Sequence, residues 1–157
     1  MADVEIDYRP ITTRDIAFLF EVYASTRTEE LAQTPWSDEQ KTAFLRQQFT
    51  AQHTHYQTHF ARADFLIILL DGVAAGRLYV DRAPTEVRVV DISILPEHRG
   101  QGLGGTILRG LLDEAAAAGK PVRVHVLKGN PAERLYRSLG FRELEDRGAH
   151  LFMEWRR

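Results

Sequence analysis

A run of glycines from Arg99 to Gly105 has the composition and spacing of a phosphate-binding loop. It reads Arg-Gly-Gln-Gly-Leu-Gly-Gly, with four glycines in the six positions from Gly100. Glycine lets a backbone N–H approach a phosphate closely, because it carries no side chain and leaves φ unrestricted. A helix is predicted to begin at about Gly104, and its N-terminus would add free N–H donors and partial positive charge. These features together predict a site for a pyrophosphate group.

Three other interpretations of the run are possible. Gly100, Gly102 and Gly105 fit the spacing of a dinucleotide-binding loop. That loop should follow a strand directly and lead to an acidic residue near the end of the next strand. Here residues 96–99 intervene, and the next predicted strand, residues 122–127, contains no acid. A P-loop would need Gly-Lys-Ser/Thr, which is absent, and a glycine-rich turn without a ligand remains open.

Around this run the sequence predicts one mixed α/β domain over residues 1–157. Alternation at Val4, Ile6 and Tyr8 predicts a strand that Pro10 ends. Apolar spacing and a Ser37–Gln40 capping box predict helices over 14–25, 29–33 and from 38 to about 59. Further predicted elements are strands 65–70, 73–80 and 87–95, a helix 104–118, a strand 122–127, a helix 132–138, and strands 142–145 and 150–155. The order indicates an antiparallel meander followed by a βαβ unit with parallel strands.

Composition narrows the classes of function. The net charge is −2, with 20 Lys plus Arg against 22 Asp plus Glu, which argues against a nucleic-acid-binding protein. The chain contains no cysteine, so a thiolate nucleophile and cysteine metal ligands are excluded. The longest apolar stretch, residues 65–70, is too short to span a bilayer, and the N-terminus has no signal-peptide pattern. We therefore expect a cytoplasmic protein without a membrane partner.

Two ordered motifs resemble those of the GNAT superfamily of N-acetyltransferases. Residues 94–105 and the following Ile107-Leu108 resemble its acetyl-CoA motif, whose signature Arg/Gln-x-x-Gly-x-Gly/Ala falls on Arg99, Gly102 and Gly104. Downstream, Asn130-Pro131-Ala132 and residues 135–141, Leu-Tyr-Arg-Ser-Leu-Gly-Phe, resemble the family's Asn…Ala…Leu-Tyr…Leu-Gly-Phe segment. The resemblance implies the GNAT fold, with helices on both faces of a mixed sheet.

The resemblance also implies a set of residues that bind acetyl-CoA. Backbone groups of the loop would hold the pyrophosphate, and the third strand of the meander would carry a bulge, splay from its parallel neighbour and admit pantetheine. A backbone N–H near Ile94 would polarise the thioester carbonyl. Asn130 would bind pantetheine, although a helix cap before Pro131 explains it equally well. The implied set is Ile92, Ile94, Arg99, Gly100, Gln101, Gly102, Leu103, Gly104, Gly105, Asn130 and Ala132.

The catalytic and acceptor residues are less fully specified. Tyr136 matches the family's general acid, and from its pattern alone it would be a core aromatic residue. For the base we favour Asp91, with Glu86 as an alternative, and Asp91 could instead pair with an arginine, Arg77 or Arg88. Trp36, Tyr56 and His59 are the candidate acceptor-binding residues. His55 and His59 have the i, i+4 spacing of a metal pair, but without a third ligand they are expected to be surface histidines and no metal is expected.

The expected activity is transfer of the acetyl group of acetyl-CoA to a primary amine in a ternary complex. The acceptor would be a small amine or an amine of a peptide or protein, and no motif selects among these. The alternative is a CoA-binding sensor or regulatory domain of the same fold without catalysis. Dimerisation is common in the family, so a homodimer is compatible with the resemblance.

Overall fold

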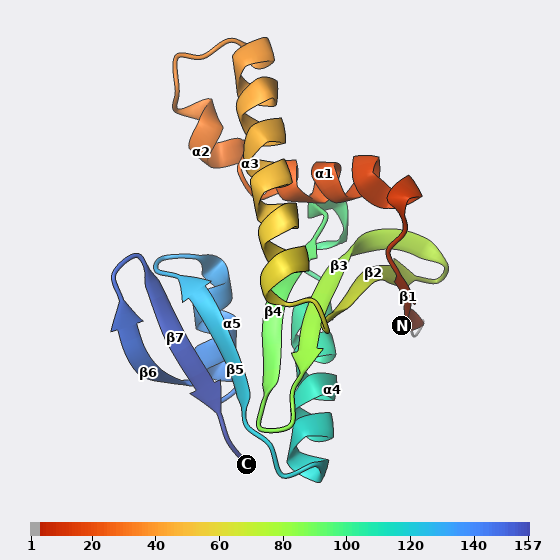
Figure 1. The fold of residues 1–157 in the computed structure, drawn as a ribbon, viewed down its shortest axis with the longest axis vertical. Helices are drawn as coiled ribbons and strands as arrows, with labels where there is room; N and C mark the ends of the chain where they lie inside the picture. Colours follow the sequence, from red (N-terminus) through yellow and green to blue (C-terminus); the bar gives the residue numbers. More distant parts are fainter. Residues whose placement is uncertain (1–3) are drawn as a thin grey trace. The chain divides into compact units, whose positions relative to one another are not determined.

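The structure is a computed structural model that describes residues 4–157, and it consists of alternating helices and strands. The elements follow the predicted order (Figure 1), and their bounds differ from the predicted ones by a few residues at most. They are β1 (Ile6–Pro10), η1 (Thr13–Asp15), α1 (Ile16–Ser25), α2 (Thr28–Ala32), α3 (Asp38–His59), β2 (Asp64–Leu70), β3 (Val73–Arg82), β4 (Val87–Ile94), η2 (Pro96–His98), α4 (Leu103–Ala117), β5 (Val122–Leu127), α5 (Pro131–Ser138), β6 (Arg142–Arg147) and β7 (His150–Trp155).

The strands form a mixed seven-stranded sheet in the order β1-β2-β3-β4-β5-β7-β6. β1 pairs antiparallel with β2, and β7 pairs antiparallel with both β5 and β6. β4 and β5 are parallel, as the predicted βαβ unit requires, because α4 carries the chain back to the end of the sheet at which β4 begins. The predicted mixed α/β fold with a meander followed by a βαβ unit is therefore confirmed.

The chain divides into two compact units. The first unit comprises the chain up to Leu78 together with Ile92–His98. The second comprises Tyr79–Asp91 and Arg99–Arg157. Strands β3 and β4 each contribute residues to both units. That the whole chain is one domain stays a prediction.

In the first unit, α1 and α3 pack through aromatic side chains. Phe49 of α3 is 5% exposed, and its ring centroid lies 5.7 Å from that of Phe20 and 5.9 Å from that of Tyr23. The remaining large apolar residues of α3 and its C-cap are only half-buried: Phe44, Leu45, Tyr56 and Phe60.

The entry into α1 is fixed by an ion pair. Arg9 of β1 donates two hydrogen bonds of 2.9 Å to the carboxylate of Asp15, which is 7% exposed. The same carboxylate accepts the backbone N–H of Thr12, while the Thr12 hydroxyl accepts the N–H of Arg14. These bonds lower the pKa of Asp15 to about 2, chiefly through the hydrogen bond from Arg9. A second capping box, Ser37–Gln40, starts α3 as predicted.

In the second unit, α4 and α5 both contact β5. The side chains of Val122, Val124 and Val126 are buried, whereas the alternating residues Arg123, His125 and Leu127 are more exposed. Arg123 lies between two carboxylates and donates to Glu86 and to Glu154, each at 2.9 Å. These two ion pairs link the loop before β4 to β5 and β7.

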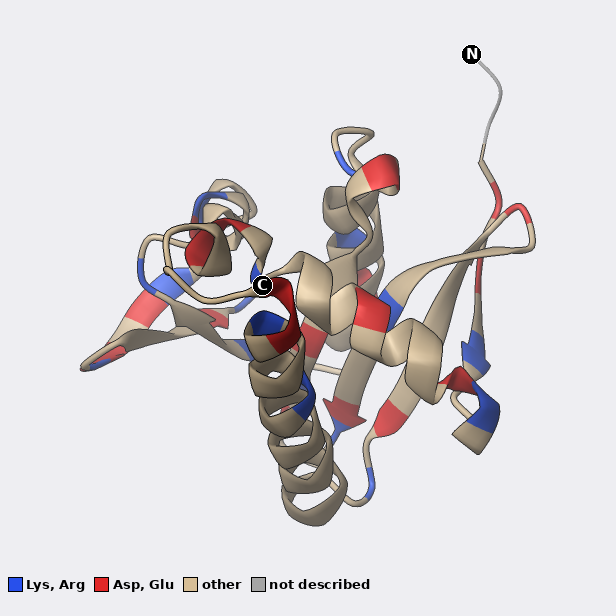
Figure 2. Cartoon of the chain, turned by 90° about the horizontal axis from the view of Figure 1, so that it is seen from above, with Lys and Arg blue, Asp and Glu red and all other residues tan. Residues whose placement is uncertain are grey.

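Charges of both signs are distributed along the elements. Figure 2 shows blue and red segments interspersed rather than separated by sign. Within residues 4–157, we find no helix whose length and apolarity together would allow it to cross a membrane.

Candidate active site

The glycine-rich loop ends in a helix start that lacks a side-chain cap. Gly100 and Gly102 have φ values of +78° and +75°, a conformation that is strained for residues with a side chain. Gly102 is the N-cap of α4, and the first turn of α4 contains no acidic residue. The Thr106 N–H makes an i→i−4 bond to the Gly102 carbonyl at 3.0 Å, so the N–H groups of residues 103–105 precede the helical ladder. This end of α4 is suited to an anion.

β4 leads into this loop and pairs with β5 over a short stretch. The parallel register runs from Val87↔Val122 to Val89↔Val124, although β4 continues to Ile94 and β5 continues to Leu127. β7, in contrast, pairs with β5 along all six residues. The short parallel pairing is compatible with the expected splay, which stays a prediction together with the roles of Ile92 and Ile94.

In the first unit, the far end of β4 approaches β3 closely at a glycine. A Cβ built on Gly76 would lie 2.2 Å from the carbonyl oxygen of Ser93. The Leu95 N–H then donates to the Ala75 carbonyl at 2.8 Å. Any side chain at Gly76 would displace the segment that immediately precedes η2 and the loop.

Asn130 has two functional groups, and the helix cap occupies one of them. Its Oδ1 accepts the N–H of Ala132 at 2.9 Å, and Pro131 takes the first position of α5. The side chain is exposed and its amide nitrogen carries two further donors. Asn130 is thus confirmed as a helix cap, and its proposed contact with pantetheine requires only the other end of the same amide.

Tyr136 and Asp91 lie within electrostatic reach of each other in the second unit. Tyr136 of α5 is 3% exposed, and its ring meets that of Phe141 edge-on with centroids 5.1 Å apart. Burial raises the pKa of the Tyr136 phenol well above its usual value of about 10, and the negative charge of Asp91 raises it further. The phenol therefore keeps its proton at neutral pH and is available there as a proton donor.

Glu86, the alternative base, is held by two guanidinium groups. Its side chain is 15% exposed, and its oxygens lie 2.8 Å from Arg88 Nε and 2.9 Å from Arg123 Nη1. Both oxygens of Glu86 therefore accept hydrogen bonds from guanidinium groups, and the Arg88 side chain is engaged by Glu86. Asp91 as the base, with Glu86 as the alternative, stays a prediction.

The three candidate acceptor residues do not converge. Trp36 precedes α3 and packs on Phe44 with ring centroids 5.1 Å apart. Tyr56 and His59 lie at the far end of the same 22-residue helix. Phe44, on which Trp36 packs, lies about 18 Å from Tyr56 along α3, at a rise of about 1.5 Å per residue. One small acceptor therefore cannot touch both ends, and Trp36 and Tyr56 cannot line one small-molecule pocket.

The histidine pair on α3 is not arranged like a metal site. The rings of His55 and His59 are stacked, with centroids 4.1 Å apart and planes at 28°. Nδ1 of His59 lies 3.1 Å from the carbonyl oxygen of His55. Across the described residues 4–157, no cluster of three or more His, Cys, Asp or Glu side chains is arranged to hold a metal ion.

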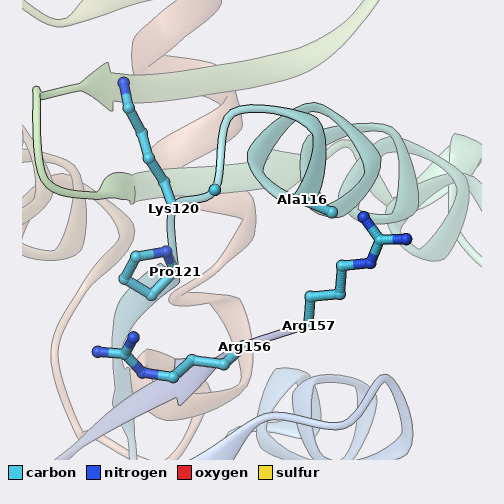
Figure 3. Close-up of a pocket in the computed structure, with 6 residues that line it drawn as sticks. Ala116, Lys120, Pro121, Arg156 and Arg157 are labelled. Carbon is cyan, nitrogen blue, oxygen red and sulfur yellow. The ribbon is translucent and has the colours of Figure 1, made fainter.

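A pocket of about 200 Å³ opens at the C-terminal end of α4, the opposite end of this helix from the glycine-rich loop. In Figure 3 the charged ends of Lys120, Arg156 and Arg157 point in different directions. Arg156 Nε is occupied by Glu154 at 2.6 Å. Because the cations do not converge on one point, we assign no ligand to this pocket.

The sequence matches the model of a known family of enzymes. The model of the acetyltransferase (GNAT) family matches residues 22–141, which is well over half of the chain. The chain belongs to the GNAT family. The match spans the glycine-rich loop, Asn130 and Tyr136, so the resemblance predicted from the two motifs is confirmed.

Individual relatives and solved structures agree with this membership. This GNAT chain is 29% identical over 135 residues to a candidate ribosomal protein bS18-alanine N-acetyltransferase of Bacillus subtilis (strain 168), covering 84% of the chain and 78% of the relative. It shares its fold with the PaiA N-acetyltransferase of Thermoplasma acidophilum, solved with coenzyme A, at TM-score 0.71, 19% identity and coverage of 98% and 99%. The ribosomal-protein-S18-alanine N-acetyltransferase of Escherichia coli matches at TM-score 0.62 and 20% identity, covering 97% of the chain and 94% of its own.

One residue near the GNAT loop was not predicted from the sequence. Arg109 follows Gly105 by four positions, so its side chain leans back over the first turn of α4 and contacts that glycine. The i, i+4 spacing of Gly105 and Arg109 in a predicted helix is the sequence feature from which this contact could have been predicted.

Proposed function

We propose that this protein is an acetyl-CoA-dependent N-acetyltransferase that acts on a primary amine. The observation that carries the proposal is the start of α4 at a left-handed glycine, with uncapped N–H groups and no acidic residue in its first turn. Family membership and the co-crystallised coenzyme A of the Thermoplasma acidophilum protein support the choice of ligand.

The residues present fit this ligand. Backbone N–H groups between Arg99 and Gly105 would bind the pyrophosphate, and the Asn130 amide would bind pantetheine. Bound acetyl-CoA supplies a thioester whose carbonyl carbon accepts an amine nitrogen and whose sulfur leaves as the thiolate. Its other contacts would come from the backbone at Ile92 and Ile94 and from the Ala132 region.

The chain's own residues move the two protons of the reaction. A substrate ammonium must lose a proton before its nitrogen can attack, and Asp91 accepts it directly or through water. The C–N bond forms as the C–S bond breaks, within a ternary complex. Tyr136 donates its phenolic proton to the departing sulfur. The attacking nitrogen loses a second proton as it becomes the amide, and this proton passes, directly or through water, to Tyr136, whose buried phenolate would be poorly solvated.

The acceptor proposed for the first test is the α-amino group of a peptide. The Bacillus subtilis and Escherichia coli proteins are both named as alanine N-acetyltransferases of ribosomal protein S18. A peptide lies along a surface, which is compatible with candidate residues that are spread along α3 rather than gathered at one point.

The decisive experiment measures release of CoA thiol from acetyl-CoA with a panel of amines. The panel should contain a peptide with N-terminal alanine, its N-terminally blocked form, a lysine-containing blocked peptide and a small polyamine. Turnover with any free amine and none with the blocked alanine peptide supports the proposal. Tight binding of CoA without turnover on every amine would support the sensor alternative instead.

A further inference from the structure

A cluster of side chains lies on the face of β5 opposite to its buried valines. The His125 cluster consists of His125, Phe152, Arg147 and Arg88. The ring centroid of His125 lies 4.6 Å from that of Phe152, its partner in the β5–β7 register. The guanidinium carbon of Arg147 lies 4.4 Å from the centroid of the same Phe152 ring, and that of Arg88 lies 5.0 Å from it. The cluster therefore connects side chains of β4, β5, β6 and β7.

A hydrogen bond between Arg147 and His125 fixes the protonation state of the imidazole. Arg147 Nη1 lies within hydrogen-bonding distance of His125 Nε2. A guanidinium group can only donate, so Nε2 is the acceptor and His125 is neutral, with its proton on Nδ1. A proton on Nε2 would bring two N–H donors face to face. It would also add a third cation to the two guanidinium groups around Phe152.

Most of the charged groups that face His125 oppose protonation of its ring. Partial burial is the main cause that lowers the pKa of His125 below its usual value of 6.5. Arg88 of β4, Arg147 of β6 and His150 of β7 lower this pKa further, and Glu145 of β6 acts in the opposite direction. Glu145 is also paired with Arg147 at 3.0 Å. His125 is therefore neutral at pH 7 and gains its second proton in acidic solution.

The end of β5 that carries His125 has fewer strand partners than its start. In the second unit, the parallel ladder with β4 ends at Val89↔Val124, whereas the antiparallel ladder with β7 continues to Leu127↔His150. The position of residues 125–127 thus depends mainly on β7 and on the His125 cluster. On the proposed function, this segment borders the gap that admits pantetheine and leads to Asn130.

We propose that the His125 cluster is a pH-sensitive contact that holds the end of β5 against the β6–β7 hairpin. With neutral His125 the contact is made and residues 125–127 are held in place. Uptake of a proton by Nε2 breaks the bond from Arg147, loosens this segment and weakens the binding of CoA. The effect on CoA rests on the proposed function, whereas the contact itself does not.

NMR titration of His125 tests the contact in the wild type, Arg147→Gln and the control Arg142→Gln. We expect the pKa of His125 to rise in Arg147→Gln, because that variant removes a cation and the hydrogen bond to the neutral ring. Arg142 is an exposed residue of the same strand, so the control removes an equal charge and should leave this pKa close to that of the wild type. An unchanged pKa in Arg147→Gln would overturn the proposal.

Amide hydrogen exchange tests whether protonation loosens the strand. In His125→Gln the side-chain oxygen can still accept from Arg147, but it does not titrate. At pH 5.0, the protection factors of residues 125–127 should be lower in the wild type than in His125→Gln, and at pH 7.5 the two proteins should agree. Equal protection at pH 5.0 would contradict the proposed loosening.

Calorimetry of CoA binding tests the consequence for the ligand. Between pH 7.5 and pH 5.0, the wild type should lose about two- to fivefold more affinity than His125→Gln, the range of a partly exposed charge interaction. The control His55→Gln, which removes an exposed histidine of α3, should follow the wild type. The same loss in wild type and His125→Gln would overturn the effect on CoA. Failure of the wild type to bind CoA at either pH would instead reject the proposed function, and the titration and exchange results would still decide the contact.

Discussion

Single residues in this protein have roles that depend on their surroundings more than on their type. Tyr136 is a core aromatic residue by its burial, and its proposed role is that of a proton donor. Asn130 caps a helix through Oδ1, and the amide nitrogen of the same side chain takes no part in the cap. For both residues the structural role and the proposed functional one are compatible, so only a variant that separates the two is informative.

Tyr136→Phe is such a variant, because it removes the proton donor and keeps the buried ring. We expect kcat to fall about 10²- to 10⁴-fold, as is typical for loss of a general acid, while the dissociation constant of CoA is unchanged. The measurement is steady-state turnover at saturating acetyl-CoA, with calorimetry of CoA binding as the folding control. An unaltered kcat across pH 6–9 would remove Tyr136 from the chemistry. Since its pKa is raised, the wild type should show no loss of rate from Tyr136 ionisation up to pH 10.

Asp15 predicts how stability responds to acid. Its pKa is lowered to about 2 in the folded protein, so it binds a proton more readily when unfolded, where its pKa is 3.8. The stabilisation is fully present above about pH 4 and is lost as the pH falls toward 2, amounting to about 1–2 kcal/mol after allowance for the half-exposed Arg9. Urea unfolding should show Asp15→Asn less stable than the wild type by a clearly larger amount at pH 7 than at pH 2.5, where part of the stabilisation remains because the folded pKa is about 2. Asp7→Asn, an exposed substitution on β1, is the control and should match the wild type at both.

At the scale of secondary-structure elements, the start of α4 lacks a stabilising side-chain cap and is also the proposed binding site for the ligand. Left-handed glycines replace the side-chain caps seen at η1, α3 and α5. The helix is instead anchored by its buried face, which includes Leu108, Leu111 and Ala115. The loop is thereby free to present N–H groups to a ligand.

Two alanine substitutions on α4 should have opposite effects on stability. At Gly102, with φ +75°, alanine should cost about 1 kcal/mol and weaken CoA binding, because the new side chain disfavours the left-handed turn. At Gly110, in the helix interior with nothing within 4 Å of a built Cβ, alanine should stabilise by up to about 1 kcal/mol and leave binding unchanged. Chemical denaturation and calorimetry test both effects. Equal CoA affinity in both variants would contradict the proposed role of the loop.

Local sequence features predicted the helices and strands, but they could not predict which residues far apart in the sequence lie in contact. The Ser37–Gln40 box, the loop glycines and the cap at Asn130 each involve residues within a few positions of one another, so a single sequence suffices. The ladder through Arg123 and the closeness of Asp91 to Tyr136 depend on sheet register and on helix docking. The separation of Trp36 from Tyr56 follows from the rise of a helix, whereas their roles in binding the acceptor stay predictions.

At the scale of the whole molecule, the two compact units are joined by continuous strands rather than by a linker. β3 and β4 each run through the boundary between them. Neither unit therefore contains a complete copy of these strands. This is the physical basis for expecting the chain to behave as one domain.

The cooperativity of unfolding of the two units can be measured, because each unit contains one tryptophan. Trp36 belongs to the first unit and Trp155 to the second. In the variants Trp155→Phe and Trp36→Phe, the remaining tryptophan reports the unfolding of its own unit. We expect the two fluorescence transitions in urea to have the same slope and midpoint after correction for each substitution, and to coincide with circular dichroism. Separate midpoints would show two domains.

The loop at the start of α4 also bears on how such an enzyme would respond to its metabolic surroundings. On the proposed function, the loop holds phosphates that acetyl-CoA and free CoA have in common, and it does not contact the acetyl group. Product would then compete with cosubstrate at similar affinity. The rate would follow the ratio of acetylated to free coenzyme more closely than the amount of either, so acetylation would slow whenever the acetyl supply falls.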